Sequence, residues 1–299
     1  GRFREPQGPY GYYLQEKGLY EIFHKDYTER MKQIWAQDAR QESRDSVLAA
    51  EDFADTYIGQ QAVHYLKTVS DEYPWHLFVS FVGPHDPFDP PTEYADRCRQ
   101  RPMPAAVPAA AEGKPQWIRR RQAGFTADEI LTSQRQYCAA IELIDDQIGL
   151  LLDQLEQRGQ LEQTYIIFAS DHGEMLGDLG LFQKSVAYEP SLRVPLIIAG
   201  PGITPASKSE ALVELIDINP TITGLAGLPP QTGLDARTLE PLLTGARQDH
   251  RPYVTARMHN FACVRDNRYK YINNYNDLPE LYDLAIDQGG LVNVFAQDR

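Results

Sequence analysis

The spacing of apolar residues predicts alternating helices and strands along most of the chain. Apolar positions recur every three or four residues over 51–69 and again over 127–158, which predicts two amphipathic helices. Continuous β-branched and aromatic runs predict strands over 76–82, 164–169 and 194–199. Because units of a helix followed by a strand build parallel sheets, we expect an α/β domain with a mostly parallel central sheet flanked by helices.

The pattern changes toward the C-terminus. A short helix is predicted over 216–227, followed by a loop-rich stretch. Three short β runs then predict a small antiparallel sheet, and these runs cover 253–256, 261–265 and 269–272. We therefore place a boundary near residue 247, between a main α/β domain over 1–246 and a C-terminal antiparallel β subdomain over 247–299. Residues 1–20, rich in Gly and Tyr, are predicted to be an irregular surface segment.

Polar residues follow the strand predicted over 164–169 at once. Asp171 and His172 come just past its carboxyl end, which is where ligands bind in open α/β sheets. A carboxylate beside an imidazole suits a divalent cation, and Gly173 allows the tight turn that both side chains need to reach it. Lys184 follows a Gly-rich turn and, if it returns to this site, would meet an anion. The sequence therefore predicts a cation site here with an anionic ligand.

His85 follows the strand predicted over 76–82. Prolines hold its loop, 83–91, in a restricted set of conformations. A histidine in such a loop is by itself more often structural than functional. With a second polar loop predicted at another strand end, we interpret His85 as a catalytic candidate.

Four motifs in order resemble one known family. The stretch SDHGEMLGDLGLFQKSVAYEPSLRVPLIIAGPG, residues 170–202, closely resembles the second signature region of the sulfatase family, within the alkaline phosphatase superfamily. FVGPHDPF at 81–88 resembles the family's substrate-binding His loop, and VELIDINPT at 213–221 resembles its DxxPT helix. LYDL at 281–284 is similar to the usual C-terminal ending. The resemblance covers about residues 50–299, and four ordered motifs are more specific than one.

The resemblance implies hydrolysis of a sulfate ester at a metal-dependent site. Asp171 and His172 would be metal ligands, Lys184 would neutralise charge on the sulfate group, and His85 would assist departure of the alcohol. His259 would be a weaker candidate for substrate contact, since the C-terminal subdomain lines the pocket rim in this family. The family favours Ca²⁺, while the imidazole leaves Mn²⁺ or Zn²⁺ open.

The chain departs from the family pattern in one major respect. Sulfatases carry two acidic metal ligands on a first strand, followed by a Cys/Ser-x-Pro-x-Arg motif whose Cys or Ser is oxidised to formylglycine. No such motif occurs in residues 1–299, and position 179, where family members often carry a second His, is Leu179. We interpret the chain as the second half of a sulfatase active site, without the N-terminal nucleophile segment and strands. By itself it is expected to be inactive, to bind metal weakly and to self-associate, which leaves a homo-oligomer open.

Three alternatives to a sulfatase function remain. A phosphonate or phosphodiester hydrolase of the same superfamily would use the same ligand types. A phosphoglycerate mutase-like protein would need more metal ligands than a chain with 7 histidines offers at its strand ends. The third is a non-catalytic remnant with a binding role.

Composition limits the classes of molecule that the chain is expected to bind. With 42 acidic and 29 basic residues the net charge is -13, which argues against nucleic-acid binding and leaves a small-molecule or carbohydrate sulfate ester as the expected partner. The Arg119-Arg120-Arg121 run is interpreted as a solvated surface or as an attraction for an anionic substrate. The three cysteines are expected to be structural.

No apolar run approaches the roughly 20 residues that span a bilayer. Localisation stays open between the cytoplasm and the periplasm or exterior, because the chain starts at Gly1 rather than Met.

Overall fold

The computed structural model describes residues 8–36, 43–110, 112–122, 124–287 and 289–296. The chain divides into two compact units, each considered by itself below. Unit 1 comprises residues 1–106 and 124–161, and unit 2 comprises 107–123 and 162–299. The boundary expected near residue 247 falls inside unit 2 and stays a prediction. In the part of the chain that the structure describes, no helix has the length and apolar character needed to cross a membrane.

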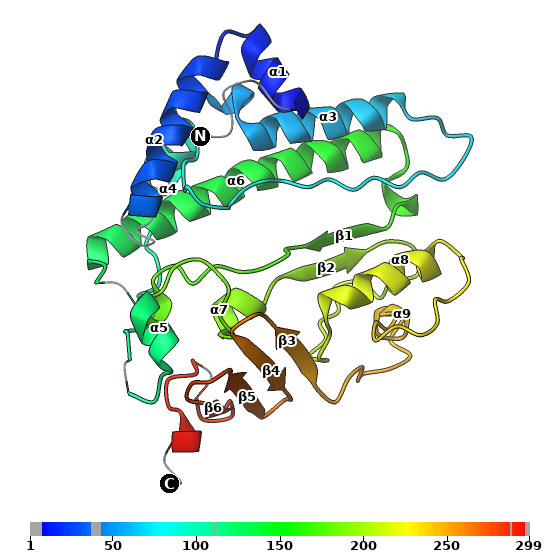
Figure 1. The fold of residues 1–299 in the computed structure, drawn as a ribbon. Helices are drawn as coiled ribbons and strands as arrows, with labels where there is room; N and C mark the ends of the chain where they lie inside the picture. The colour runs from blue at the N-terminus through cyan, green and yellow to red at the C-terminus, as the bar shows by residue number, and fades with distance from the viewer. Residues whose placement is uncertain (1–7, 37–42, 111, 123, 288, 297–299) are drawn as a thin grey trace. The chain divides into compact units, whose positions relative to one another are not determined.

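Unit 1 is helical (Figure 1). Its helices are α1 (Gly8–Glu16), α2 (Tyr20–Ala36), α3 (Ala54–Thr68), α4 (Thr92–Cys98) and α6 (Ala127–Gln157). The two predicted long helices are confirmed as α3 and α6, which run side by side. At Gly59 of α3 an added Cβ would lie 2.6 Å from Oε1 of Gln147 on α6, so a glycine permits this close approach.

Capping residues set the ends of α6. Thr126 Oγ1 accepts a hydrogen bond from Glu129 N at 3.2 Å, and Glu129 Oε2 accepts one from Thr126 N at 2.7 Å, which completes a capping box. Gly159, just past the helix, has a φ of 67°. This left-handed conformation favours glycine and ends the helix where the sequence predicts.

Residues 8–20 differ from the irregular surface segment that the sequence predicts for residues 1–20, and residues 1–7 of that prediction lie outside the described part of the chain. The described residues form α1 and the start of α2. Tyr10 and Tyr13 pack their rings against Tyr57 of α3, with centroids 5.3 and 4.9 Å apart, and Leu14 is fully buried. Aromatic packing against α3 therefore outweighs the turn signals of the Gly residues.

The strand predicted over 76–82 is also corrected. The segment is extended, but within the described residues it pairs with no other strand. Its side chains alternate between half-buried and exposed, with Phe78 81% exposed. Its end is held by Asp55, whose carboxylate accepts from Val82 N at 2.6 Å and from Gly83 N at 3.0 Å. A run of β-branched and aromatic residues favours extended backbone, but a β ladder also needs a neighbouring strand.

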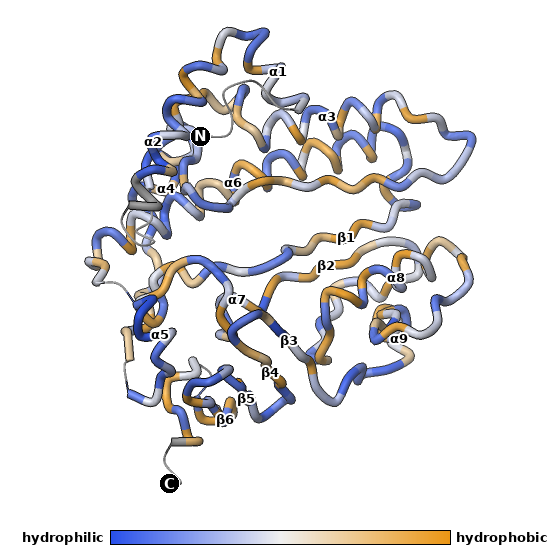
Figure 2. Tube along the Cα trace, in the orientation of Figure 1, coloured by the Kyte–Doolittle hydropathy of each residue, from blue (hydrophilic) through white to orange (hydrophobic). Residues whose placement is uncertain are grey.

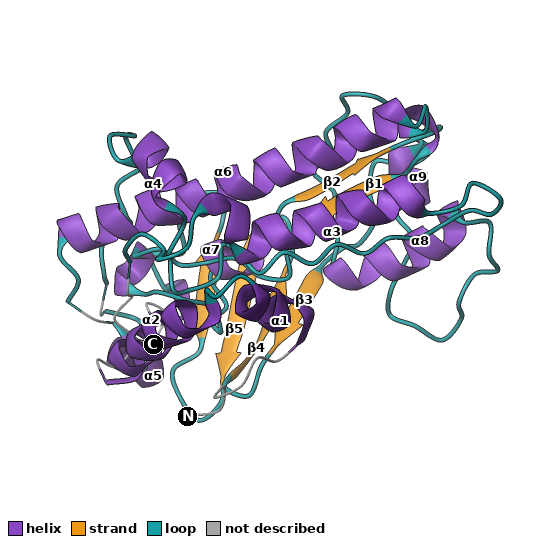
Figure 3. Ribbon diagram, turned by 90° about the horizontal axis from the view of Figure 1, so that it is seen from above, coloured by secondary structure: helices purple, strands orange, loops and turns teal. Residues whose placement is uncertain are grey.

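Unit 2 contains two separate sheets, seen as two groups of strands in Figure 3. The first pairs β1 (Ile166–Ala169) with β2 (Leu196–Ala199), and the second has the order β3-β4-β5-β6. The strands of the second sheet are β3 (Val254–Arg257), β4 (Phe261–Arg265), β5 (Tyr269–Asn274) and β6 (Glu280–Asp283). The helices of unit 2 are α5 (Gln116–Arg121), α7 (Glu189–Leu192), α8 (Ile218–Leu225) and α9 (Glu240–Leu243).

The expected α/β class and the antiparallel C-terminal sheet are confirmed, but the parallel arrangement is not. Both described sheets are antiparallel, and Ala169 at the end of β1 faces Leu196 at the start of β2. The connection between them stays at the carboxyl end of β1, whereas a parallel pair needs a crossover back to the other end. Both strands are apolar (Figure 2), and Phe168 and Ile197 are 38% and 62% exposed, so burial on both faces is also not seen.

The main core of unit 2 joins the loop after β1 to the C-terminal sheet. Met175, Leu181 and Val186 from the loop are almost completely buried, as are Phe261 and Ile272 from the sheet. The segment that carries Lys184 is therefore anchored on both sides by core residues. A four-stranded antiparallel sheet provides the rigid base for a loop with little regular structure of its own.

Candidate functional site

Asp171 and His172 lie side by side immediately after β1, with only Ser170 between. Asp171 Oδ1 accepts a hydrogen bond from His172 N at 2.9 Å, and Asp171 Oδ2 lies 3.6 Å from His172 Nε2. The Asp171 side chain is 86% exposed. The carboxylate and the imidazole thus present donor atoms close enough together to share one cation.

The backbone fixes the orientation of the His172 ring. Its Nδ1 lies 2.8 Å from the Gly173 carbonyl oxygen, and Ser170 Oγ donates to the His172 carbonyl at 2.7 Å. When Nδ1 donates to the carbonyl, the lone pair is on Nε2, the nitrogen that faces Asp171. A backbone carbonyl on the far nitrogen is the usual partner of a metal-binding histidine. The residues present therefore fit a divalent cation, as two of its ligands.

Gly173 is required by a close approach of two backbone segments. Its N–H donates to the Ser191 carbonyl at 2.9 Å, and an added Cβ would lie 1.9 Å from the carbonyl oxygen of Pro190. The sequence suggests a tight turn as the reason for this glycine. The structure assigns it instead to the contact that fastens the Asp171-His172 loop to α7.

Replacing Gly173 with Ala is expected to destabilise the protein by about 1–3 kcal/mol or more, because neither backbone segment can yield without moving the loop. Urea-induced unfolding measures the loss. Gly149→Ala is the matched control, since its Cβ would meet nothing within 4 Å in the interior of α6. That change is expected to be neutral or slightly stabilising. Equal stabilities of the two variants would contradict the close approach at Gly173.

The segment leading to Lys184 has an unusual backbone. Four non-glycine residues between β1 and β2 have positive φ, namely Leu176, Leu179, Gln183 and Ser185. Such conformations cost about 1–3 kcal/mol each and persist where the surrounding structure enforces them, often at functional sites. Here the enforcement comes from the core, in which Leu179 is 2% exposed. Leu179 is therefore a core residue in this protein.

Arg121 holds the Lys184 loop from one side. Its guanidinium donates to three backbone carbonyls, those of Phe182 and Ser185 at 3.3 Å and that of Lys184 at 2.9 Å. The pKa of Arg121 is lowered because burial outweighs the opposing effect of the nearby Glu174. Arg119 and Arg120 are exposed, as a solvated run would be. Sequence reasoning grouped the three arginines and missed that Arg121 positions the backbone at Lys184.

Asp217 is the centre of a buried polar cluster that the sequence did not reveal. It is 0% exposed and accepts hydrogen bonds from Glu214 N, Arg237 N and the Arg251 guanidinium, with His250 Nε2 at 3.1 Å. Burial by itself raises the pKa of this carboxyl, but Arg251 and the backbone N–H groups outweigh burial and the pKa is lowered. The sequence places Asp217 only near the start of the helix predicted over 216–227, whereas the structure gives it the role of joining α8 to the segment 235–251.

His85 and His259 are placed in loops, as predicted. His85 belongs to unit 1, is exposed, and has its Nδ1 2.8 Å from the Asp86 carbonyl oxygen. His259 is exposed in the turn between β3 and β4 of unit 2. The convergence of His85 with Asp171, His172 and Lys184 stays a prediction, as does substrate contact by His259.

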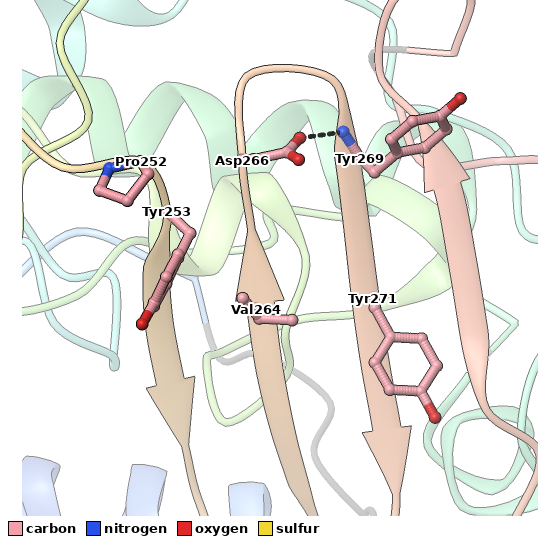
Figure 4. Close-up of a pocket in the computed structure, with 6 residues that line it drawn as sticks. All are labelled: Pro252, Tyr253, Val264, Asp266, Tyr269 and Tyr271. Carbon is pink, nitrogen blue, oxygen red and sulfur yellow. Dashed lines mark hydrogen bonds between the residues drawn. The ribbon is translucent and has the colours of Figure 1, made fainter. Parts of the chain in front are cut away.

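A surface hollow lies on the C-terminal sheet (Figure 4). Its lining comes from one face of β4 and β5, from the turn between them and from the two residues before β3, and consists of Pro252, Tyr253, Val264, Asp266, Tyr269 and Tyr271. None of the candidate site residues lines it. The hollow is therefore separate from the predicted cation site.

Two family models match the chain. The model "Sulfatase" matches residues 11–228, and the model "N-sulphoglucosamine sulphohydrolase, C-terminal" matches residues 177–299. Together they cover both described units, so the resemblance of the motifs extends to nearly the whole sequence.

Individual relatives agree with these models. The chain is 32% identical over 265 residues to the choline-sulfatase of Rhizobium meliloti (strain 1021), covering 81% of this chain and 51% of that protein. It is 29% identical over 259 residues to an arylsulfatase of Clostridium perfringens (strain 13 / Type A), covering 81% and 54%. The chain thus spans about half the length of the curated relatives it matches.

The fold has counterparts among solved structures. The phosphonate monoester hydrolase of Agrobacterium radiobacter superposes with a TM-score of 0.76 at 26% identity, covering 84% of this chain and 58% of that chain. This likeness agrees with the α/β class. One family model spans most of the residues of this chain, and a sulfatase more than 30% identical aligns with four fifths of the chain's length. The chain therefore belongs to the sulfatase family.

Proposed function

We propose that the full-length protein hydrolyses sulfate esters in a metal-dependent reaction, and that this chain supplies one part of the active site. The observation that carries the proposal is the Asp171-His172 pair, oriented by backbone contacts in a loop at the end of β1 in a sulfatase family member. The partner is a small-molecule or carbohydrate sulfate ester. The names of the relatives favour choline sulfate and aryl sulfates as first substrates to test.

The metal ligands on this chain would be Asp171 and His172, with Ca²⁺ the first choice and Mn²⁺ or Zn²⁺ as alternatives. When bound, the cation would supply positive charge for an anionic oxygen of the ester. The chain's own contribution is to keep the two donors together. The Gly173 carbonyl holds the imidazole, and the contact between Gly173 and α7 holds the loop.

Lys184 and His85 would act on the substrate itself. The Lys184 ammonium neutralises charge on the sulfate group, and its backbone is positioned by Arg121. His85 donates a hydrogen bond to the bridging oxygen and so assists departure of the alcohol, which leaves with a proton. Glu174 supports the loop by accepting from Gln183 N. The nucleophile, a formylglycine, is proposed to lie outside residues 1–299.

The proposal is tested by assaying the full-length protein on an aryl sulfate and on a phenylphosphonate monoester. We expect a higher kcat/KM for the sulfate, loss of turnover with a chelator and recovery with Ca²⁺ or Mn²⁺. A higher kcat/KM for the phosphonate would assign the protein to phosphonate hydrolysis instead. No hydrolysis of either ester would favour a binding role. The 299-residue chain alone is expected to be inactive, because none of its residues matches the nucleophile motif.

A further inference from the structure

Two cysteines and a glutamate come together between α4 and α6 in unit 1. The thiol sulfurs of Cys98 and Cys138 and a carboxylate oxygen of Glu142 all lie within 4.8 Å of one another. Cys98 is completely buried, and the other two are half-buried. Within the described residues, this is the only group of three side chains so arranged for a metal. It contains no residue of the candidate active site.

We propose that Cys98, Cys138 and Glu142 bind one thiophilic divalent cation of the Zn²⁺ class, with a water molecule as fourth ligand. A tetrahedral ion with Zn–S bonds of about 2.3 Å and Zn–O bonds of about 2.0 Å needs donors roughly 3.3–3.8 Å apart. The observed spread of up to 4.8 Å is wider than this range, so binding requires side-chain rotations that bring the three donor atoms closer together. Thiolate ligands select Zn²⁺ or Cd²⁺ over Ca²⁺, which prefers oxygen.

The helices already hold the ligands in place. Cys138 and Glu142 are four residues apart on α6 and so share one face of the helix. Cys98 is the last residue of α4, and it packs with Ala139 and Leu143 of α6 in a small core cluster. A cation here would join two helices that are in contact without it. It would also fix α4, which directly follows the loop that carries His85.

Arg101 currently supplies the positive charge at this cluster. Its Nη1 donates to Cys138 Sγ at 2.9 Å and its Nη2 to Glu142 Oε1. The Arg101 side chain is 42% exposed, so the guanidinium can turn out into solvent when a cation replaces it. Burial raises the pKa of the Cys98 thiol to about 11, with Cys138 as the next cause. The Cys98 thiol therefore has to release its proton to solvent as its sulfur binds the ion.

The test is a titration of the chain with Cd²⁺ under a metal-free reductant, followed by thiolate-to-metal charge-transfer absorbance in the ultraviolet. We expect one equivalent to bind and an excess of Ca²⁺ not to displace it. Cys138→Ser is expected to abolish the band and Glu142→Gln to weaken binding about tenfold or more. Asp145→Asn, which changes an exposed carboxylate on the same helix, is the matched control and is expected to leave binding unchanged.

Arg101→Met tests the same site by a second route if the cysteine variant fails to fold. Because it removes the competing guanidinium, it is expected to tighten Cd²⁺ binding at least several-fold. Absence of the band in reduced wild type would overturn the proposal. A band that survives Cys138→Ser, or one that disappears in Cys263→Ser, would assign the thiolate to another place and would also overturn it.

Discussion

Replacing Arg251 with Met is expected to lower the free energy of unfolding by about 3–5 kcal/mol, the usual cost of removing one partner from a buried ion pair. Asp217 is 0% exposed and the Arg251 side chain only 8%, and the two are joined by hydrogen bonds from Nε and Nη2. Without the guanidinium, the buried carboxylate keeps only its backbone donors and His250. Urea-induced unfolding of wild type and variant measures the difference.

The control is Arg268→Met, which removes an arginine from a surface pair. The Arg268 side chain is 62% exposed, and Nη2 lies 3.0 Å from Asp283 Oδ2. Because water screens exposed pairs, this variant is expected to unfold almost as wild type does. If the two variants lose equal stability, the Asp217 cluster does not have the role we assign to it.

Low pH is expected to reduce the stability difference between wild type and Arg251→Met. The pKa of Asp217 is lowered in the folded protein, so the folded state binds this proton less readily than the unfolded state. The resulting stability is fully present above the ordinary carboxyl pKa of about 4 and is lost as the pH falls through the lower folded value. The stability difference between wild type and Arg251→Met should therefore be constant near neutrality and shrink below about pH 4. A difference that grew in acid would contradict the lowered pKa.

Replacing Lys184 with Ala in the full-length protein is expected to lower kcat/KM for a sulfate ester by about 30- to 1000-fold, or roughly 2–4 kcal/mol of transition-state stabilisation. The reason is the loss of the positive charge that we propose lies beside the sulfate oxygens. Arg121 holds the Lys184 backbone, and the buried side chains around it limit movement of the loop. Steady-state kinetics on an aryl sulfate measure the effect.

Two further variants separate charge from structure. Lys184→Arg keeps the charge and is expected to recover part of the activity, since a guanidinium does not reproduce the position of an ammonium. Lys208→Ala removes a lysine that is 85% exposed and pairs with the nearby Glu210, and it should leave kcat/KM unchanged. Wild-type kcat/KM in Lys184→Ala would show that Lys184 is a surface residue without a catalytic role.

Local features of the sequence were sufficient for several of the elements and for the family. The apolar periodicity and the capping residues of α6 predict that helix almost to the residue, because both act within one or two turns. The runs that predict β3, β4 and β5 are confirmed for the same reason, and their turns are short enough to impose antiparallel pairing. Asp171 and His172 could also be placed just after a strand, since their position depends on the end of β1 alone.

Only the tertiary structure decided how these elements meet. The direction of β1 against β2, the failure of segment 76–82 to pair with another described strand and the buried donors around Asp217 all depend on neighbours far away in the sequence. The same holds for the contact of Gly173 with Pro190 and for the carbonyls bound by Arg121. Periodicity reports which face of an element is buried but not what covers it. Hydrogen bonds and close approaches between distant segments are fixed by packing, and no local pattern encodes them.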